Sequence, residues 1–314
     1  MDYAKFSLLR KHYIYDTDND GFGCLWALQH NGLMPYMRTE ARSRTVPPAI
    51  YQRADVVVIM DRSYPNEVLL ELAQRYLVIV IDHHDHPGRF DGGTPVMTLD
   101  DIPNDATRGL FYRVNSERCA AWQTWEFFFG HYEVPELLRY VDDRDRYVNV
   151  LPSTHEVTMY LTNIPREQIV WDNFDLSTAI EIGRHMLEVK NRAIAMITQP
   201  GMYSIEKVGK GLQCAFCNSK LYYSDVANAI LVKEPDVDIA AVWWQSRDAI
   251  HVELRSRKGS GIFVNDIAMF NHGGGHENAS GYVHSGVEMG FRTIVATVCR
   301  GVTALRPIET QETK

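Results

Sequence analysis

The sequence lacks an apolar run of the roughly 18 to 20 residues that a membrane span requires. Its start, MDYAKFSLLRKHYIYD, also lacks the apolar core and the small-residue cleavage site of a signal peptide. We therefore expect a cytoplasmic protein with no membrane partner.

Cysteine is scarce, with five residues scattered along a chain of 314. The odd number and irregular spacing argue against a disulfide framework. Cys214 and Cys217 form a lone C-x-x-C, and no second pair lies at the spacing of a zinc finger. We expect reduced thiols with a structural role.

Basic residues are in the minority, and the formal net charge is −8. Residues 201–314 hold 12 basic and 12 acidic side chains, whereas residues 1–200 hold 20 basic and 28 acidic ones. Long nucleic acids are bound through many Lys and Arg contacts to phosphate. The charge pattern therefore favours a phosphate substrate that is short, or one whose phosphate is bound through metal ions.

The apolar pattern predicts an α/β protein of two domains, because the chain is long for a single core. Over residues 1–175, runs rich in Val and Ile alternate with helical patterns, which is typical of a parallel sheet with flanking helices. Residues 176–200 predict a helical linker, with the helix itself over 176–197, and residues 201–314 a smaller mixed α/β domain. The stretch 85–109, rich in Gly, Pro and Asp, predicts an irregular segment beside the site. The last eight residues predict a frayed tail.

The segment YDTDNDGFG places Asp16, Asp18 and Asp20 at alternate positions before Gly21. This is how an EF-hand loop begins, but its twelfth position would be Ala27, which has no side-chain oxygen, and a strand pattern precedes it. Taken alone, the motif is equally compatible with a metal site and with Asp20 capping the helix that follows.

Polar groups end two further buried strands. Asp61 follows VVVIM, and Asp82, His83 and His84 follow LVIVI. An apolar core has no use for three consecutive polar groups, and imidazole with carboxylate suits manganese or iron better than calcium. A further acidic cluster, in VDDRD, follows a helical pattern and could equally be a solvated helix end.

In chain order, five motifs resemble the DHH superfamily of phosphoesterases with its DHH-associated C-terminal domain. They are D-x-D-x-D-G from Asp16, the strand-terminal Asp61, the Asp-His-His from Asp82, the VDDRD cluster, and GGGHENASG over Gly273–Gly281. The family includes RecJ-type exonucleases, nanoRNases, dinucleotide phosphodiesterases, phosphatases of 3'-phosphoadenosine 5'-phosphate and relatives of exopolyphosphatase. The resemblance makes residues 1–175 the catalytic domain and 201–314 the substrate-binding domain.

The resemblance also implies a ligand set for two divalent ions, with Mn²⁺ expected and Mg²⁺ or Co²⁺ as alternatives. Asp61 would bridge the ions and act with His83 and His84 in catalysis, while Asp82 and His84 would orient His83 and touch the phosphate. In the fourth cluster Asp143 is the expected ligand and Asp142 the alternative. The full expected metal-binding set is Asp16, Asp18, Asp20, Asp61, Asp82, His83 and Asp143.

One position departs from the family pattern. Many relatives have a ligating histidine four residues before the equivalent of Asp18, and here that residue is Ile14. RecJ-type members instead have the aspartate found here as Asp16. We therefore expect Asp16 to complete the first ion's ligand set.

The glycine-rich motif of the second domain is expected to hold the far end of the substrate. Its backbone N–H groups can cradle an anion, and His276 can donate to a phosphate. The resemblance adds an arginine that precedes this loop: Arg255 by position, with Arg257 second. The expected substrate-binding set is His84, Arg255, Gly273, Gly274, Gly275, His276 and Asn278.

Together these features predict a manganese-dependent phosphodiesterase of the nanoRNase type. It would release nucleoside 5'-monophosphates from short oligonucleotides through a hydroxide activated by two metal ions, with the distance between the domains setting the preferred length. Alternatives are a linear or cyclic dinucleotide phosphodiesterase, a 3'-phosphoadenosine 5'-phosphate phosphatase, and a non-catalytic nucleotide-binding regulatory module. A homodimer is left open.

Overall fold

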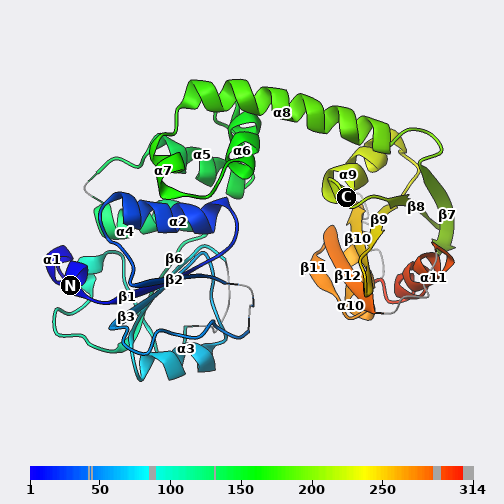
Figure 1. Ribbon diagram of the computed structural model, residues 1–314. Helices are drawn as coiled ribbons and strands as arrows, with labels where there is room; N and C mark the ends of the chain where they lie inside the picture. Colours follow the sequence, from blue (N-terminus) through cyan, green and yellow to red (C-terminus); the bar gives the residue numbers. More distant parts are fainter. Residues whose placement is uncertain (42, 44, 85–89, 131, 286–290, 307–314) are drawn as a thin grey trace, which may run out of the picture. The chain divides into compact units, whose positions relative to one another are not determined.

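The computed structural model describes residues 1–41, 43, 45–84, 90–130, 132–285 and 291–306 (Figure 1). The chain divides into two compact units, Met1–Leu187 and Glu188–Lys314. The division falls inside α8 (Leu176–Ile197), the long helix that the sequence predicts at this place. In the described ranges no helix is both long and apolar enough for a membrane span.

The first unit is built on a six-stranded sheet in the order β2-β1-β3-β4-β6-β5, and every pairing in it is parallel. Its central strands β3 and β4 are buried throughout, as their Val and Ile content predicts. The strands are β1 (Lys11–Tyr15), β2 (Met37–Glu40), β3 (Val56–Met60), β4 (Leu77–Asp82), β5 (Thr94–Pro95) and β6 (Gly109–Val114).

Two parts of this sheet were not predicted. β2 is an edge strand whose residues are mostly exposed, so it has no apolar run by which to find it. The stretch 85–109 was expected to be irregular, but it contains β5 and a 3₁₀ helix at Leu99–Asp101. The short β5 exists because Thr94 and Pro95 pair with β6, a contact that no local pattern encodes. Residues 85–89 of this stretch lie outside the described residues.

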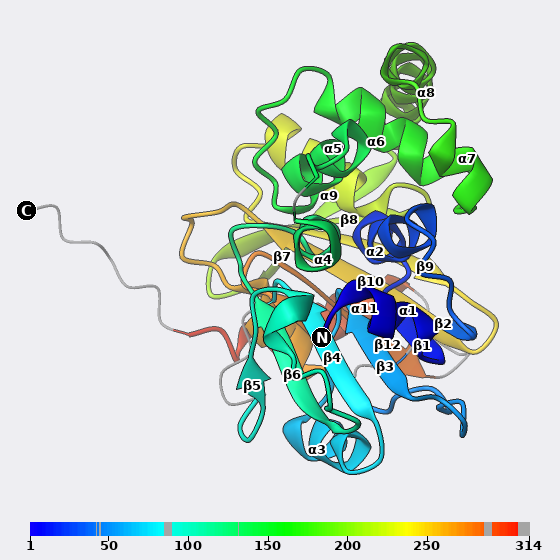
Figure 2. The same ribbon diagram turned by 90° about the vertical axis from the view of Figure 1, so that its left-hand side faces the viewer.

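Helices cover both faces of the sheet. One face packs against α2, α4, α5 and α7, and the other packs against α3 (Figure 2). The helices of this unit are α1 (Tyr3–Leu8), α2 (Asn19–His30), α3 (Asn66–Ala73), α4 (Ala120–Phe129), α5 (Glu136–Asp145), α6 (Thr154–Asn163) and α7 (Gln168–Asp172).

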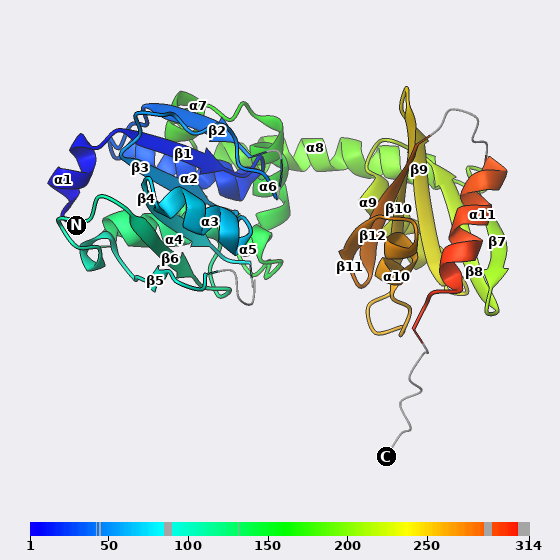
Figure 3. The same cartoon turned by 90° about the horizontal axis from the view of Figure 1, so that it is seen from below.

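The second unit has a mixed sheet in the order β11-β12-β10-β9-β8-β7, in which only the β8–β9 pair is parallel. α9 lies on one face, and α10 and α11 lie on the other (Figure 3). The strands are β7 (Tyr203–Gly209), β8 (Leu212–Asn218), β9 (Ile239–Gln245), β10 (Ala249–Ser256), β11 (Gly274–His276) and β12 (Ala279–Ser285). The helices are α9 (Tyr223–Lys233), α10 (Val264–Phe270) and α11 (Phe291–Val302).

Cys214 and Cys217 are free thiols in β8. They belong to the cores on opposite faces of the sheet, as residues three apart in a strand must. The pair therefore has the structural role predicted for it.

Candidate metal centre

The parallel sheet brings its strand-terminal polar residues to one edge. Tyr15, the last residue of β1, pairs with Met60 of β3, and Met60 pairs with Ile81 of β4. Asp61 follows Met60 and Asp82 follows Ile81, so the two aspartates come at adjacent positions along the same edge of the sheet. Carboxyl ends of parallel strands are where ligands bind in such folds. Asp61 adopts a left-handed backbone with φ 57°, a conformation that Asp tolerates better than most residues.

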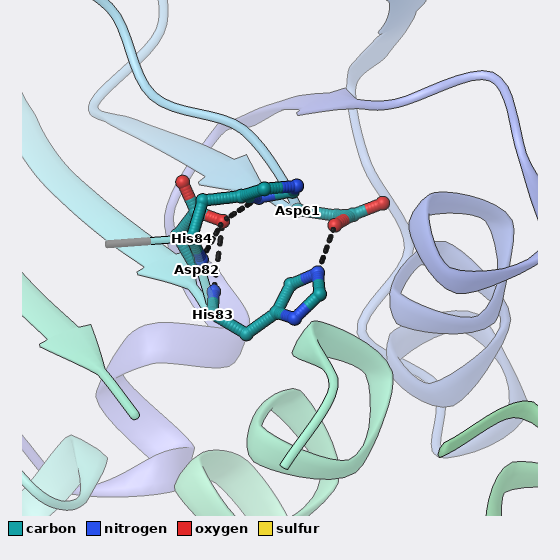
Figure 4. Close-up of side chains that lie close together, drawn as sticks. All are labelled: Asp61, Asp82, His83 and His84. Carbon is teal, nitrogen blue, oxygen red and sulfur yellow. Dashed lines mark hydrogen bonds and ion pairs between the residues drawn. The ribbon is translucent and has the colours of Figure 1, made fainter. Parts of the chain in front are cut away.

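Three carboxylates converge on one nitrogen of His83. Its Nε2 lies 3.3 Å from Asp61 Oδ1, 3.3 Å from Asp145 Oδ2 and 3.6 Å from Asp20 Oδ2 (Figure 4 shows Asp61). One N–H can donate to only one of the three, and each distance exceeds the usual hydrogen-bond length of about 2.7–3.2 Å. Asp20, His83 and Asp145 form one group that could hold a metal ion, and Asp61 and His83 belong to another with Asp82 and His84. Imidazole with carboxylate suits a first-row divalent cation.

Asp20 is fixed by the helix that lies over it. Its two carboxylate oxygens accept hydrogen bonds from the backbone N–H groups of Ala120 (2.8 Å) and Ala121 (2.7 Å), at the start of α4. The cap expected from Asp20 is therefore made to a helix a hundred residues away, while the helix after YDTDND, α2, is capped by Asp18. The remaining lone pairs of Asp20 can still accept a cation.

Asp82 orients the turn that carries the two histidines. Its Oδ1 accepts from the backbone N–H of His83 (2.8 Å), the backbone N–H of His84 (3.2 Å) and His84 Nδ1 (2.7 Å) (Figure 4). Burial raises the pKa of Asp82, but these hydrogen bonds outweigh it and leave the pKa lowered. Asp82 is therefore a buried, ionised anchor for the turn that carries His83.

The other carboxyls of the centre have raised pKa values. Burial, and then the charges of Asp20, Asp18, Asp145 and Asp82, raise the pKa of Asp61 well above its usual range. Burial also raises the pKa of Asp20. For Asp145, burial and the charges of Asp20 and Asp18 raise the pKa to about 8. A cation bound among these carboxyls would oppose all three shifts, because a nearby positive charge favours the ionised form.

The raised pKa of Asp145 predicts how the metal-free protein responds to pH. The folded value of about 8 exceeds the ordinary value of 3.8, so the folded state holds this proton more tightly. The contribution of this carboxyl to the free energy of unfolding is fully present below about pH 4 and is lost as the pH rises through about 8. The loss is at most about 1.4 kcal/mol per pH unit for one carboxyl. Urea unfolding in EDTA should therefore show a falling stability between about pH 5 and about pH 8.

Two comparisons check this assignment. Asp145→Asn should flatten the decline, and Mn²⁺ should stabilise the native protein most at the higher pH, where it meets ionised carboxylates. An identical pH slope in the native and Asp145→Asn proteins would contradict the prediction.

The structure places Asp143, the ligand expected from the fourth acidic cluster, away from His83. Asp143 is buried, but it accepts from the backbone N–H groups of Val150 (2.9 Å) and Leu151 (3.1 Å) and from the Thr154 hydroxyl. These bonds lower its pKa against the effect of burial, with a further contribution from Arg146. Asp143 thus holds the loop after α5 and does not face His83.

The alternative, Asp142, is also engaged elsewhere. It accepts from the Cys119 backbone N–H (2.7 Å) and lies 3.3 Å from guanidinium nitrogens of Arg118 and Arg146. Asp145 is the member of the cluster that reaches His83, and the sequence pattern gave no reason to prefer it. All three aspartates lie in the last turns of α5, and not after it as expected.

In the first motif, D-x-D-x-D-G, Asp16 and Asp18 make hydrogen bonds that hold the local structure. Asp16 Oδ2 accepts from Arg62 Nη2 at 2.5 Å, and its Oδ1 accepts from the Thr17 N–H. Asp18 Oδ1 accepts from the Gly21 N–H as the cap of α2. The structure therefore gives Asp16 a cationic partner of its own, and Asp18 lies at the rim of the centre, where its charge is felt by Asp61 and Asp145.

Solved structures resemble this chain over nearly its whole length. A structure described as the DHH domain of a member of the s1p family of ribosomal proteins superposes with a TM-score of 0.59 at 14% identity, over 97% of this chain and 89% of that one. An exopolyphosphatase-related protein from Bacteroides fragilis gives a TM-score of 0.52 at 13% identity, over 96% of this chain and 94% of that one. The protein has the DHH fold. Identities this low establish the fold alone.

A sequence relative extends the comparison to a virus. An uncharacterized protein of Acanthamoeba polyphaga mimivirus, R106, is 31% identical over 240 residues, which are 74% of this chain and 54% of that protein. The chain thus spans about half the length of this curated relative. No family model matches the sequence.

Beside the centre of this DHH fold lies a cavity of about 150 Å³. Asp18, Asp20 and Asp145 line it together with Arg144, whose guanidinium lies 4.8 Å from the ring centroid of Tyr147. Arg144 puts a cation next to the carboxylates that line this cavity. The sequence reasoning missed this residue because arginine next to aspartate in a helix reads as an ordinary surface pair.

In the second unit of the DHH fold, Gly274, Gly275 and His276 form the exposed strand β11. Gly273 and Gly275 are required by crowding, because a Cβ would lie 2.1 Å from Gly281 O at the first and 2.6 Å from Ala279 O at the second. Gly274 has open space where a Cβ would be. The loop therefore presents backbone and the His276 ring to solvent.

Asn278, which was expected to bind substrate, and Arg257, the second choice behind Arg255, make hydrogen bonds that hold the fold. Asn278 donates to Ser256 Oγ (2.9 Å) and to carbonyl groups of Ile262 and Arg257, so its amide is committed to the hairpin. Arg257 donates to carbonyls at the end of α9. Arg255 lies on the sheet with 16% of its side chain exposed, and its Nη1 is 3.7 Å from Glu253 Oε2. It donates to Ser224 Oγ at 2.9 Å and to the Leu254 carbonyl at 2.9 Å.

Proposed function

We propose that the protein is a metal-dependent phosphodiesterase that hydrolyses short oligonucleotides, with Mn²⁺ as its metal and nucleoside 5'-monophosphates as products. The observation that carries the proposal is the convergence of Asp20, Asp61 and Asp145 on His83 Nε2. The fold of the solved relatives and the order of the five sequence motifs support the same chemistry. Localisation in the cytoplasm remains part of the proposal.

The residues divide the work as follows. Asp20, Asp61, His83 and Asp145 would hold divalent ions, with Asp18 at the rim. Such ions, when bound, lower the pKa of a coordinated water and neutralise charge on the phosphate oxygens. Asp82 keeps the His83 turn in place, while His84 is half-exposed and can touch a phosphate oxygen. Arg144 would bind the phosphate from the cavity side.

The second unit would hold the rest of the substrate. Arg255, His276 and the backbone of Gly273, Gly274 and Gly275 can bind a phosphate without a long basic surface. Because charges in residues 201–314 balance, this unit offers little grip on an extended strand. Short substrates follow from this balance.

We expect cleavage to fall steeply with RNA length. The pure protein with Mn²⁺ would be given 5'-labelled RNAs of about two to twenty nucleotides, and the initial rate measured for each. A maximum at a few nucleotides would support an oligoribonuclease, and cleavage confined to dinucleotides a dinucleotide phosphodiesterase. A DNA series of equal lengths and an EDTA control accompany it. Faster cleavage of the longest RNAs would refute the length limit.

A further inference from the structure

The second unit leaves part of one sheet face open. Along β10, Ile250, Val252 and Leu254 are buried against α10 and α11, so the alternate residues point to the other face, where they are half-buried. On that other face α9 and the end of α8 cover the β8–β9 half. The β12 and β11 half keeps exposed positions, including Val283, Gly274 and His276.

The strand register arranges this open face in rows. Trp244 of β9 pairs with His251 of β10, which pairs with Val283 of β12. Two residues along β10, Glu253 pairs with Gly281. Two residues further, Arg255 pairs with Ala279, which pairs with His276 of β11. The face thus has an aromatic row at one end and a cationic row, Arg255 with His276, at the other.

The aromatic row is an ordered stack. The rings of Trp244 and His251 have centroids 4.9 Å apart and planes 1° apart, and the Tyr223 ring stacks on Trp244 at 5.0 Å and 24°. Tyr223 is 38% exposed, and Val283 beside His251 is 55% exposed. Rings that only filled a core would be covered by apolar neighbours, whereas this row borders solvent.

The two ends of the face are a substrate's length apart. His251 and Arg255 are separated by four residues along a strand, which at about 3.4 Å per residue is about 14 Å. Between the two rows the Glu253 side chain lies over Gly281, where a Cβ would come within 2.9 Å of Glu253 Oε1. Glu253 Oε2 lies 3.7 Å from Arg255 Nη1, so the guanidinium offsets the charge of this carboxylate. A short oligonucleotide lying along the strands can reach both rows.

We propose that the aromatic row, Tyr223, Trp244 and His251, is a stacking platform for a nucleobase of the substrate whose phosphate the cationic row binds. The inference rests on the proposed function for the identity of the ligand. Every base has a π-face, so the platform recognises nucleotides without selecting among bases. This unit would then distinguish a nucleotide from a bare sugar phosphate or polyphosphate.

The first test measures binding to the full chain in EDTA by calorimetry with two probes that can reach both rows, a 5'-phosphorylated adenine dinucleotide and the same sugar-phosphate backbone without its bases. Stacking is worth about 1–3 kcal/mol per base, so the dinucleotide should bind about 5- to 150-fold more tightly than the abasic probe. Trp244→Ala and His251→Ala should remove this difference, while Trp244→Phe and His251→Phe retain it. His284→Ala, an exposed histidine of β12 that pairs with Ile250 and so lies on the opposite face, is the matched control.

Equal affinity for the two probes, or an equal loss for both probes in the alanine variants, would overturn the platform. If Trp244→Ala does not fold, the half-exposed His251→Ala still decides the question. Hydrolysis is measured separately with Mn²⁺: base-dependent binding without hydrolysis would overturn the proposed function and leave the platform standing. Hydrolysis with an unchanged KM in both alanine variants would overturn the platform and leave the proposed function standing.

Discussion

Replacing Asp61 with asparagine is expected to lower Mn²⁺-dependent hydrolysis of short RNA by about three orders of magnitude. Metal ions stabilise the transition state of such reactions by several kcal/mol, and each tenfold in rate corresponds to about 1.36 kcal/mol. Asp61 is 2% exposed and lies 3.3 Å from His83 Nε2, at the middle of the carboxylate group. An amide in its place removes the negative charge that would hold the cation.

The same substitution should stabilise the metal-free protein at neutral pH. Burial and neighbouring carboxylates raise the pKa of Asp61, so its ionised form is unfavourable in the fold when no cation is present. Asparagine is nearly isosteric and tolerates the left-handed backbone at φ 57°, whereas alanine would add strain. Loss of activity together with a gain in stability separates a ligand from a structural residue.

The measurements are kcat with Mn²⁺ and urea unfolding in EDTA for both proteins. Asp248→Asn is the control, because the Asp248 side chain is 86% exposed and lies in the other unit. Retention of more than about a tenth of the native rate by Asp61→Asn would be incompatible with a central role.

Asp145→Asn and Asp143→Asn are expected to have opposite effects, although the two residues are neighbours in one helix. Asp145→Asn should lower kcat by about 10²- to 10³-fold and leave the fold intact, because Asp145 Oδ2 is buried and has no hydrogen-bond partner among the described residues. Asp145 Oδ2 lies 3.3 Å from His83 Nε2.

Asp143→Asn should instead destabilise the protein by about 1–3 kcal/mol, the cost of leaving buried donors unpaired. The N–H groups of Val150 and Leu151 and the Thr154 hydroxyl all donate to this carboxylate, and an amide cannot accept from all of them. The rate per folded molecule should stay near the native value at 25 °C. Urea unfolding and kcat of both variants check the pair, and the reversed pattern would restore Asp143 as the ligand.

Much of the site can be predicted from the sequence because its residues end neighbouring strands of a parallel sheet. Runs of Val and Ile that alternate with helical patterns are typical of central strands of a parallel sheet, and polar groups that end such strands meet at one edge. Asp61, Asp82 and His83 could therefore be placed together before any coordinates. The structure, by contrast, shows that the glycine motif lies in a tight hairpin, where a side chain at Gly273 or Gly275 would collide with the neighbouring strand.

The sequence could not decide which aspartate of a cluster does what. In YDTDND each aspartate is equally suited to cap a helix or to bind a metal. Only the packing of α4 over α2 shows that Asp20 receives the N–H groups of Ala120 and Ala121, and that Asp18 caps its own helix. The partner of Asp16, Arg62, follows a different strand.

The choice between Asp143 and Asp145 has a geometric cause. Successive residues of an α-helix turn by about 100°, so these two side chains point about 200° apart, to opposite sides of α5. The sequence determined that the last turns of this helix carry three carboxylates. Which of them faces His83 depends on how α5 rotates about its axis as Leu137, Leu138 and Val141 pack into the core of the first unit, and that rotation is set by contacts with residues distant in the chain.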